Sequence, residues 1–206
     1  MVITHHGAQC FKVSFGDTTI AFDPISKKSK LDSVKFGADI AFISLNHPDM
    51  NGANEVAFGA KQPFIVSGPG EYEIGEVTAR GYGVETMYEN VKRWNTIYQV
   101  TLEGITMVFL GALGSETIEP HILGELDDID ILFIPIGGGD VLDVPAASKF
   151  GTKLEARCII PMHYTDAALK AFLKEEGVDN GSTLEKFTVK KKDLLEMEGE
   201  IVVLGG

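Results

Sequence analysis

The sequence predicts an α/β (α+β) fold of four layers, αββα, in which two β-sheets face each other and helices cover their outer faces. Three observations support this prediction. Short strand patterns, some alternating and some continuously apolar, fill most of the chain. Helical patterns are few, and most lie between the later strands. No linker, low-complexity tract or short repeat divides the chain, so we expect one domain over residues 1–206.

The first half of the chain is a series of strands. Residues 10–23 predict a hairpin, because CFKVSF alternates apolar and polar side chains and TTIAFD follows the turn Gly16-Asp17. The continuous apolar run ADIAFISL predicts a strand covered on both faces. The strands PFIVSG and EVTARGYGV follow, separated by the glycine-rich GPGEYEIG. A second hairpin joins NTIYQVTL to ITMVFLGAL through Glu103-Gly104.

The second half alternates strands with helices. IDILFIPIGGG and RCIIPM predict buried strands, and EIVVLGG predicts a last strand. One helix begins at Val144-Pro145, because proline suits the first helical turn. Another begins at the N-cap pair Thr165-Asp166 and ends at Gly177. Two weaker helices are expected over residues 119–126 and 51–60.

Composition excludes some function classes. The 206 residues are 44% hydrophobic and 23% charged, with a net charge of -12, which disfavours a nucleic-acid partner. No apolar run approaches the ~18 residues of a membrane span, and the start of the chain lacks a secretory signal, so we expect no membrane partner and a cytoplasmic location. Cys10 and Cys158 both lie in apolar strand patterns and are expected to be buried, reduced thiols.

Polar or glycine-rich residues follow four of the apolar strands, where such folds tend to build their sites. These places are residues 23–24, 46–51, 110–114 and 162–164. In the second of them, His47 and Asp49 lie two residues apart, and both residue types bind metals. Asn-x-Pro-Asp is also strong turn chemistry, so a loop held by hydrogen bonds is the alternative interpretation.

These stretches, taken in order, resemble the metallo-β-lactamase fold superfamily. The most similar branch is that of the ascorbate-6-phosphate-lactonase-like, Zn-dependent hydrolases. The resemblance runs nearly end to end and implies an αββα sandwich with two metals at one edge, between the sheets. The residues that carry it are ITHHGAQCFKV, TTIAFDP, ISLNHPDMN, GPGEYEIG, MVFLGALG, IDILFIPIGGG and IIPMHY.

The same resemblance implies that several metal ligands are lost. The family's loop reads His-x-His-x-Asp-His, and its first and last histidine positions carry Leu45 and Met50 here. Ala112 stands at the position of the bridging aspartate, and Phe109 stands near a further histidine position. A two-metal hydrolase needs a shared bridging ligand, which alanine cannot supply.

Other positions of the pattern are kept. His47 and Asp49 match the loop, and His163 in PMHY matches the last ligand. Asp23 matches an aspartate that usually orients a ligand. In the family pattern, the residue at the position of His47 binds one metal, and those at the positions of Asp49 and His163 bind the other. If all three were to bind the same ion, their side chains would have to rearrange. We therefore expect no metal, or one weakly bound zinc or manganese ion, with Asp49 as the candidate catalytic residue.

Other residues are weaker candidates. His5, His6 or His121 could replace a lost ligand, but adjacent residues of a strand point to opposite faces, so at most one of the first two faces any site. His163 could instead be a histidine with satisfied hydrogen bonds near the core. Glu71 and Glu73 share one face of a strand and could form an acid/base pair, or a charged edge in water. The glycines of IPIGGG suggest a tight turn rather than a phosphate loop.

Three hypotheses of function follow. The first is a superfamily member with a dismantled two-metal site that binds an unidentified small molecule or partner without hydrolysis. The second is a hydrolase of a lactone or phosphoester with one metal on His47, Asp49 and His163. The third is an interaction module, expected to form a homo-oligomer, whose acidic surface binds cationic or protein partners.

Overall fold

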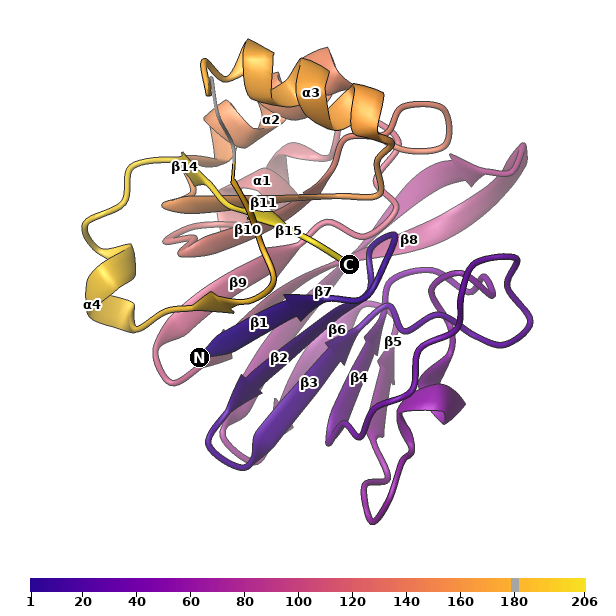
Figure 1. Cartoon of the computed structure of the whole chain (residues 1–206). Coiled ribbons are helices and arrows are strands. Elements are labelled where there is room, and N and C mark those ends of the chain that lie inside the picture. Colours follow the sequence, from indigo (N-terminus) through magenta and orange to yellow (C-terminus); the bar gives the residue numbers. More distant parts are fainter. Residues whose placement is uncertain (179–181) are drawn as a thin grey trace.

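The computed structural model describes residues 1–178 and 182–206 and contains two sheets that face each other (Figure 1). The first sheet has the order β13-β1-β2-β3-β4-β5, and the second has the order β14-β11-β10-β9-β8-β7-β6. The strands of the first sheet are Phe187–Thr188, Val2–His5, Phe11–Phe15, Thr18–Phe22, Ile40–Ile43 and Phe64–Ser67. Those of the second are Glu200–Ile201, Cys158–Met162, Ile131–Pro135, Ile105–Phe109, Val91–Leu102, Val77–Tyr88 and Gly70–Ile74.

Both predicted hairpins are present. β2 and β3 pair antiparallel around Gly16-Asp17, and β8 and β9 pair antiparallel around Glu103-Gly104. β7 and β8 are longer than predicted. Each has twelve residues, and the two pair antiparallel as far as Tyr88 and Val91. GPGEYEIG was expected to separate two strands, but Gly70–Ile74 itself pairs with β7 as the edge strand β6.

The helices lie mostly on the second sheet (Figure 1). They are α1 (Pro120–Glu125), α2 (Val144–Leu154), α3 (Asp166–Glu175) and the single turn α4 (Lys191–Leu194). α2 and α3 begin as predicted, because Asp143 and Thr165 accept hydrogen bonds from the exposed N–H groups of Ala146 and Ala168.

The outer face of the first sheet has a thinner cover. The helix expected over residues 51–60 is only one 3-10 turn, Ala53–Val56. Ile25, Val34 and Phe36 from the preceding loop complete the apolar layer there. One outer layer is therefore helical and the other consists mainly of loops.

Aromatic rings fill the space between the two sheets. Phe22 of β3 stacks on Phe109 of β9 with 4.8 Å between ring centroids, so one side chain joins the two layers. Cys10 and Cys158 are buried and free, as predicted. EIVVLGG is not one strand: Glu200–Ile201 forms β14, whereas Val203–Leu204 forms β15, which pairs with β12 (Thr183–Leu184).

Candidate functional site

The carboxyl ends of several parallel strands meet at one edge of the sandwich. β3 and β4 are parallel neighbours in the first sheet, and β9, β10 and β11 are parallel neighbours in the second. The segments that leave them are those singled out in the sequence, together with the glycine turn after β10. This edge is where α/β folds commonly place their sites.

A chain of polar side chains crosses this edge. Asp23, after β3, accepts hydrogen bonds from the Ser44 N–H at 2.6 Å, from the Ser44 hydroxyl and from Gln9 Nε2 at 2.7 Å. Gln9 Oε1 lies 3.2 Å from Nδ1 of His163, which follows β11. Asp23 therefore reaches His163 through Gln9, a residue that no sequence argument had identified.

Burial controls the charges along this chain. Asp23 is fully buried, and burial raises its pKa to about 7, although the hydrogen bonds from Ser44 and Gln9 oppose the shift. Burial also lowers the pKa of His163, while the charges of Asp49 and Asp140 act in the opposite direction. Burial therefore favours the neutral imidazole of His163.

His47 and Asp49 are held by hydrogen bonds in their loop. His47 Nε2 lies 3.1 Å from Glu89 Oε2, and His47 Nδ1 lies 3.4 Å from Asp49 Oδ2. Asp49 also accepts hydrogen bonds from the hydroxyls of Tyr88, at 3.1 Å, and Ser29. These contacts tie the loop to the β7–β8 hairpin and agree with the interpretation of a hydrogen-bonded turn.

Tyr88 packs on both of the candidate histidines. Its ring centroid is 4.9 Å from that of His47 and 6.1 Å from that of His163. Within residues 1–178 and 182–206, no three His, Cys, Asp or Glu side chains gather as a metal-binding group.

Apolar side chains gather beside these polar residues. Leu45, Met50 and Ala112 form one buried cluster with Tyr88 and Val141. Three of the four positions that the sequence analysis interprets as lost ligands thus belong to the same apolar cluster. The fourth, Phe109, lies in the central core, where its ring packs on Phe22 and Phe133.

Asn95 is a second residue that the sequence did not reveal. Its side chain is fully buried, donates to the carbonyl of Leu110 at 2.9 Å and accepts from the N–H of Ala112 at 2.9 Å. Asn95 also bridges to Leu45. Asn95 therefore holds the segment of Ala112 through its side-chain amide and the segment of Leu45 through a backbone β-bridge.

Of the other histidines, His5 lies nearest to this group, because the carbonyl of Ala8 also accepts the backbone N–H of His163. His5 stacks on Phe11, whereas His6 packs on Phe36, so the two point to opposite faces as predicted. His5 hydrogen-bonds to the carbonyl of Ala8, and His6 hydrogen-bonds to Thr4. His121 is exposed in the first turn of α1.

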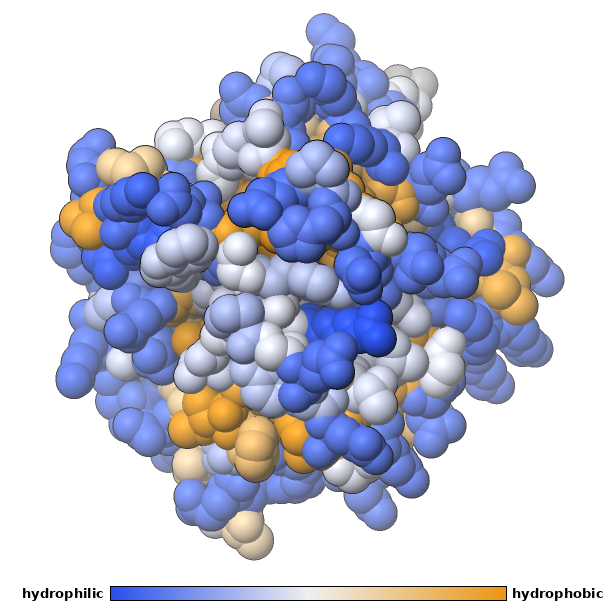
Figure 2. All heavy atoms as spheres, turned by 180° about the vertical axis from the view of Figure 1, so that it is seen from behind, coloured by the Kyte–Doolittle hydropathy of each residue, from blue (hydrophilic) through white to orange (hydrophobic). Residues whose placement is uncertain are grey.

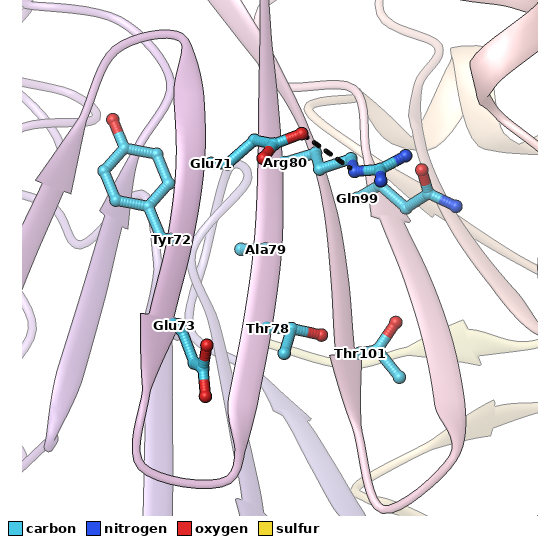
Figure 3. A pocket seen from close by; sticks show the side chains of 8 residues that line it. All are labelled: Glu71, Tyr72, Glu73, Thr78, Ala79, Arg80, Gln99 and Thr101. Carbon is cyan, nitrogen blue, oxygen red and sulfur yellow. Dashed lines mark ion pairs between the residues drawn. The ribbon is translucent and has the colours of Figure 1, made fainter.

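Glu71 and Glu73 lie on the outer face of the second sheet. This face is largely hydrophilic in the rear view, with apolar side chains in separate groups (Figure 2). The two glutamates line a shallow hollow of about 540 Å³ over β6, β7 and β8, where Glu71 lies 3.5 Å from Arg80 (Figure 3). Both are exposed, as in the prediction of a charged edge.

The glycine turn after β10 allows a close approach of backbone, as predicted. A Cβ at Gly137 would lie 2.2 Å from the carbonyl oxygen of His163. Only glycine therefore lets this turn pass against the segment that carries the histidine.

Comparison with known proteins identifies the family. Residues 2–163 match the family model described as the beta-lactamase superfamily domain. The chain belongs to this superfamily. The predicted resemblance and the mixed α/β sandwich are both confirmed.

Two relatives and two solved structures show the extent of the similarity. A UPF0173 metal-dependent hydrolase of Listeria innocua is 27% identical over 195 residues, which cover 80% of this chain and 85% of that protein. One of Bacillus licheniformis is 24% identical over 196 residues, covering 80% and 86%. A metallo-beta-lactamase superfamily protein of Thermotoga maritima has a TM-score of 0.76 at 26% identity, covering 98% of this chain and 97% of that one. A metallo hydrolase of Ignicoccus hospitalis shares the fold, with a TM-score of 0.65 at 20% identity, covering 92% and 99%.

The relatives of Listeria innocua and Bacillus licheniformis are both named metal-dependent hydrolases. Among the residues that the structure describes, no helix is long and apolar enough to cross a membrane. The cytoplasmic location stays a prediction.

Proposed function

We propose that this chain is a superfamily member without two-metal hydrolysis, which binds at most one divalent ion weakly and keeps the fold as a binding protein. The observation that carries the proposal is the buried cluster of Leu45, Met50, Ala112, Tyr88 and Val141. In the family pattern, three of these positions belong to the metal ligands. Here their side chains are apolar and packed against one another.

Burial of apolar side chains supports a site that is filled by hydrocarbon rather than left open for a metal. Leu45 is 1% exposed, and Met50 and Ala112 are fully buried, so the apolar surfaces are removed from water. Tyr88 adds its ring to this cluster and directs its hydroxyl to Asp49. A divalent ion with a shared bridging ligand would meet hydrocarbon at these three positions, where it finds no donor.

The experiment is a measurement of metal per chain by elemental mass spectrometry. The protein would be purified untagged and without chelator, then exposed to zinc or manganese and desalted. We expect well below one ion per chain. Two ions per chain would contradict the proposal outright.

A hydrolase with a single metal is the second candidate. The contact between His47 and Asp49 favours it, because two suitable donors already lie side by side. The relatives are named metal-dependent hydrolases, and these names also support this candidate. This candidate requires near-stoichiometric metal that is lost in both His47→Ala and His163→Ala, together with hydrolysis of a lactone or phosphoester.

Self-association is a further property to test, since large apolar side chains are exposed on β5 and on the β7–β8 hairpin. Trp94 is 68% exposed, and Phe64 and Ile65 are each more than half exposed. Native mass of the untagged protein distinguishes a homo-oligomer from a monomer. We expect no nucleic-acid partner, because the net charge of -12 repels phosphate.

A further inference from the structure

β5 (Phe64–Ser67) is an edge strand of the first sheet and differs from the other edge strands (Figure 1). The other edges of the two large sheets are protected from further pairing, because β13 and β14 have two residues each and β6 carries Glu71 and Glu73. β5 has four residues and no charged side chain, and Phe64 and Ile65 are 53% and 51% exposed. Of these four edges, β5 is therefore the most open to another strand.

The backbone of β5 directs two of its residues away from the sheet. β5 pairs in parallel with β4, and at the start of this ladder the N–H of Phe64 donates to the carbonyl of Asp39 at 2.8 Å. Because alternate residues of a strand turn their N–H and C=O groups to opposite sides, Phe64 and Val66 face β4, whereas Ile65 and Ser67 face outward. Within residues 1–178 and 182–206, these four outward groups have no backbone partner.

Prolines limit the outward groups to these two residues. By the same alternation Pro63 and Pro69 are the next outward positions, and proline has no N–H to donate. The hydrogen-bonding pattern from Pro63 to Pro69 is therefore symmetric about Val66. An antiparallel partner strand satisfies all four groups if it offers an N–H and a C=O at two positions with the same spacing. A second copy of β5, related by a two-fold axis at Val66, has this pattern.

We propose that two copies of this chain pair antiparallel through β5 and form a dimer in which the two first sheets become continuous. Ile65 of each copy exchanges both hydrogen bonds with Ser67 of the other, and Val66 lies opposite Val66. A shift of two residues in either direction would set Ser67 opposite Pro63, or Ile65 opposite Pro69, and leave a carbonyl without a donor. The two prolines therefore fix the register.

Side chains beside the ladder fit this register. Phe64 comes to lie next to Gly68 of the second copy, where a Cβ would meet nothing within 4 Å, so the ring has room. Trp94, which is 68% exposed, lies near the end of β5, because a Cβ at Gly83 would contact both Pro69 at 3.5 Å and Trp94 at 3.8 Å. Apolar surface therefore continues from β5 to the β7–β8 hairpin.

The exposed apolar area suits a dimer of moderate affinity. A large apolar side chain carries about 150–250 Å² of surface, so the exposed parts of Phe64, Ile65 and Trp94 come to on the order of 350 Å² per copy. Two copies contribute about twice this area, and the backbone of the ladder adds to it, which approaches the lower limit of about 1,200 Å² for stable interfaces. We therefore expect a dissociation constant on the order of 10 µM.

The experiment is sedimentation equilibrium of the untagged full chain from about 1 to about 200 µM. We expect the mass to rise from that of a monomer to that of a dimer. Higher salt should strengthen the dimer, because two chains with a net charge of -12 repel each other. Ile65→Lys places an ammonium group at the ladder, and Ile65→Pro removes one outward N–H per copy. Each should weaken the dimer at least tenfold.

Leu195→Lys is the matched control. Leu195 is 54% exposed and follows α4, which comes after β13 at the opposite edge of the first sheet. This variant gains the same charge as Ile65→Lys and loses a similar apolar surface, so its dissociation constant should stay within twofold of the unchanged chain. Thermal melting should show that all three variants fold.

A cross-link tests the register directly. In the proposed ladder Val66 meets Val66 of the second copy as a non-hydrogen-bonded pair, in which Cα atoms lie about 4.5 Å apart, within reach of a disulfide. Cys10 and Cys158 are buried, so they do not compete. Mild oxidation should join Val66→Cys chains into covalent dimers, whereas Leu195→Cys chains should stay unlinked.

Four results would overturn the proposal. The first is a monomer over the whole concentration range, which would leave the free edge to a strand of another protein. The second is equal weakening by Ile65→Lys and Leu195→Lys, because charge alone would then act. The third is an oligomer that forms unchanged in both Ile65 variants, and the fourth is a dimer without the Val66→Cys cross-link. The last two would keep the self-association considered above but place its surface elsewhere. None of the four bears on the metal per chain that tests the filled site.

Discussion

Two neighbouring regions at the same edge of the sandwich bury their side chains by different means. In one, Asp23, Gln9 and His163 form a polar chain in which each group has a hydrogen-bond partner. In the other, Leu45 and Met50 pack with three further side chains and contribute no polar group. Both regions are buried apart from the partly exposed His163, and both lie where the family resemblance places the metal site.

The difference shows what a buried position requires of its side chain. A polar side chain can stay only if every donor and acceptor is matched, because an unmatched buried group costs about 1–3 kcal/mol. Positions without a matching partner are stable when they are apolar and in contact with each other. Each region should therefore be sensitive to a different kind of substitution.

The largest effect is expected in the polar region, from Asp23→Ala. This change leaves the Ser44 N–H, the Ser44 hydroxyl and Gln9 Nε2 without their acceptor in a fully buried place. We expect a loss of about 3–5 kcal/mol in the free energy of unfolding, measured by urea denaturation.

Asp32→Ala is the control for this change. Asp32 is exposed, so the same substitution there should alter stability by less than about 0.5 kcal/mol. Equal effects of the two variants would show that the polar chain is not a stabilising network.

A smaller effect is expected in the apolar region, from Met50→Ala. Met50 is fully buried, so truncation removes its contacts with the cluster and leaves a cavity. We expect a loss of about 2–3 kcal/mol. His47→Ala is the matched change in the same loop. Its side chain is 11% exposed and contacts Glu89 and the ring of Tyr88, so we expect a loss of about 1–2 kcal/mol, smaller than that of Met50→Ala. A larger loss from His47→Ala than from Met50→Ala would reverse the comparison.

The sequence predicted those elements that have local signals. The hairpin of β2 and β3 followed from Gly16-Asp17, and the starts of α2 and α3 followed from residues that cap a helix. The extension of β7 and β8 was missed, because Glu85 and Lys92 are not typical strand residues. Their side chains instead pair across the hairpin at 2.7 Å, a contact that exists only after the strands align.

The sequence predicted only those residues of the candidate site that lie within short sequence motifs. His47, Asp49 and His163 come from motifs, and the replaced positions Leu45, Met50 and Ala112 come from the same motifs. Gln9 and His163 are hydrogen-bonded although 154 positions separate them in the sequence. Tyr88 and Asp49 are hydrogen-bonded across a separation of 39 positions. No periodicity or spacing signals such contacts, because only the packing of the two sheets brings them together.

The smallest effect concerns pH and separates the charge of Asp23 from its hydrogen bonds. Its folded-state pKa of about 7 lies above its unfolded value, so the folded state holds the extra proton. The stability that this proton contributes is fully present below the unfolded pKa and is lost as pH rises through 7. We expect the free energy of unfolding to decline by about 1 kcal/mol between pH 6.5 and 8, and Asp23→Asn, which cannot titrate, should remove this decline.

The histidines with lowered pKa act mainly below this window and are present in both proteins, so the difference between the two urea-denaturation curves isolates Asp23. Parallel pH profiles of the two proteins would show that Asp23 is already charged throughout the window, held so by the donors of Ser44 and Gln9.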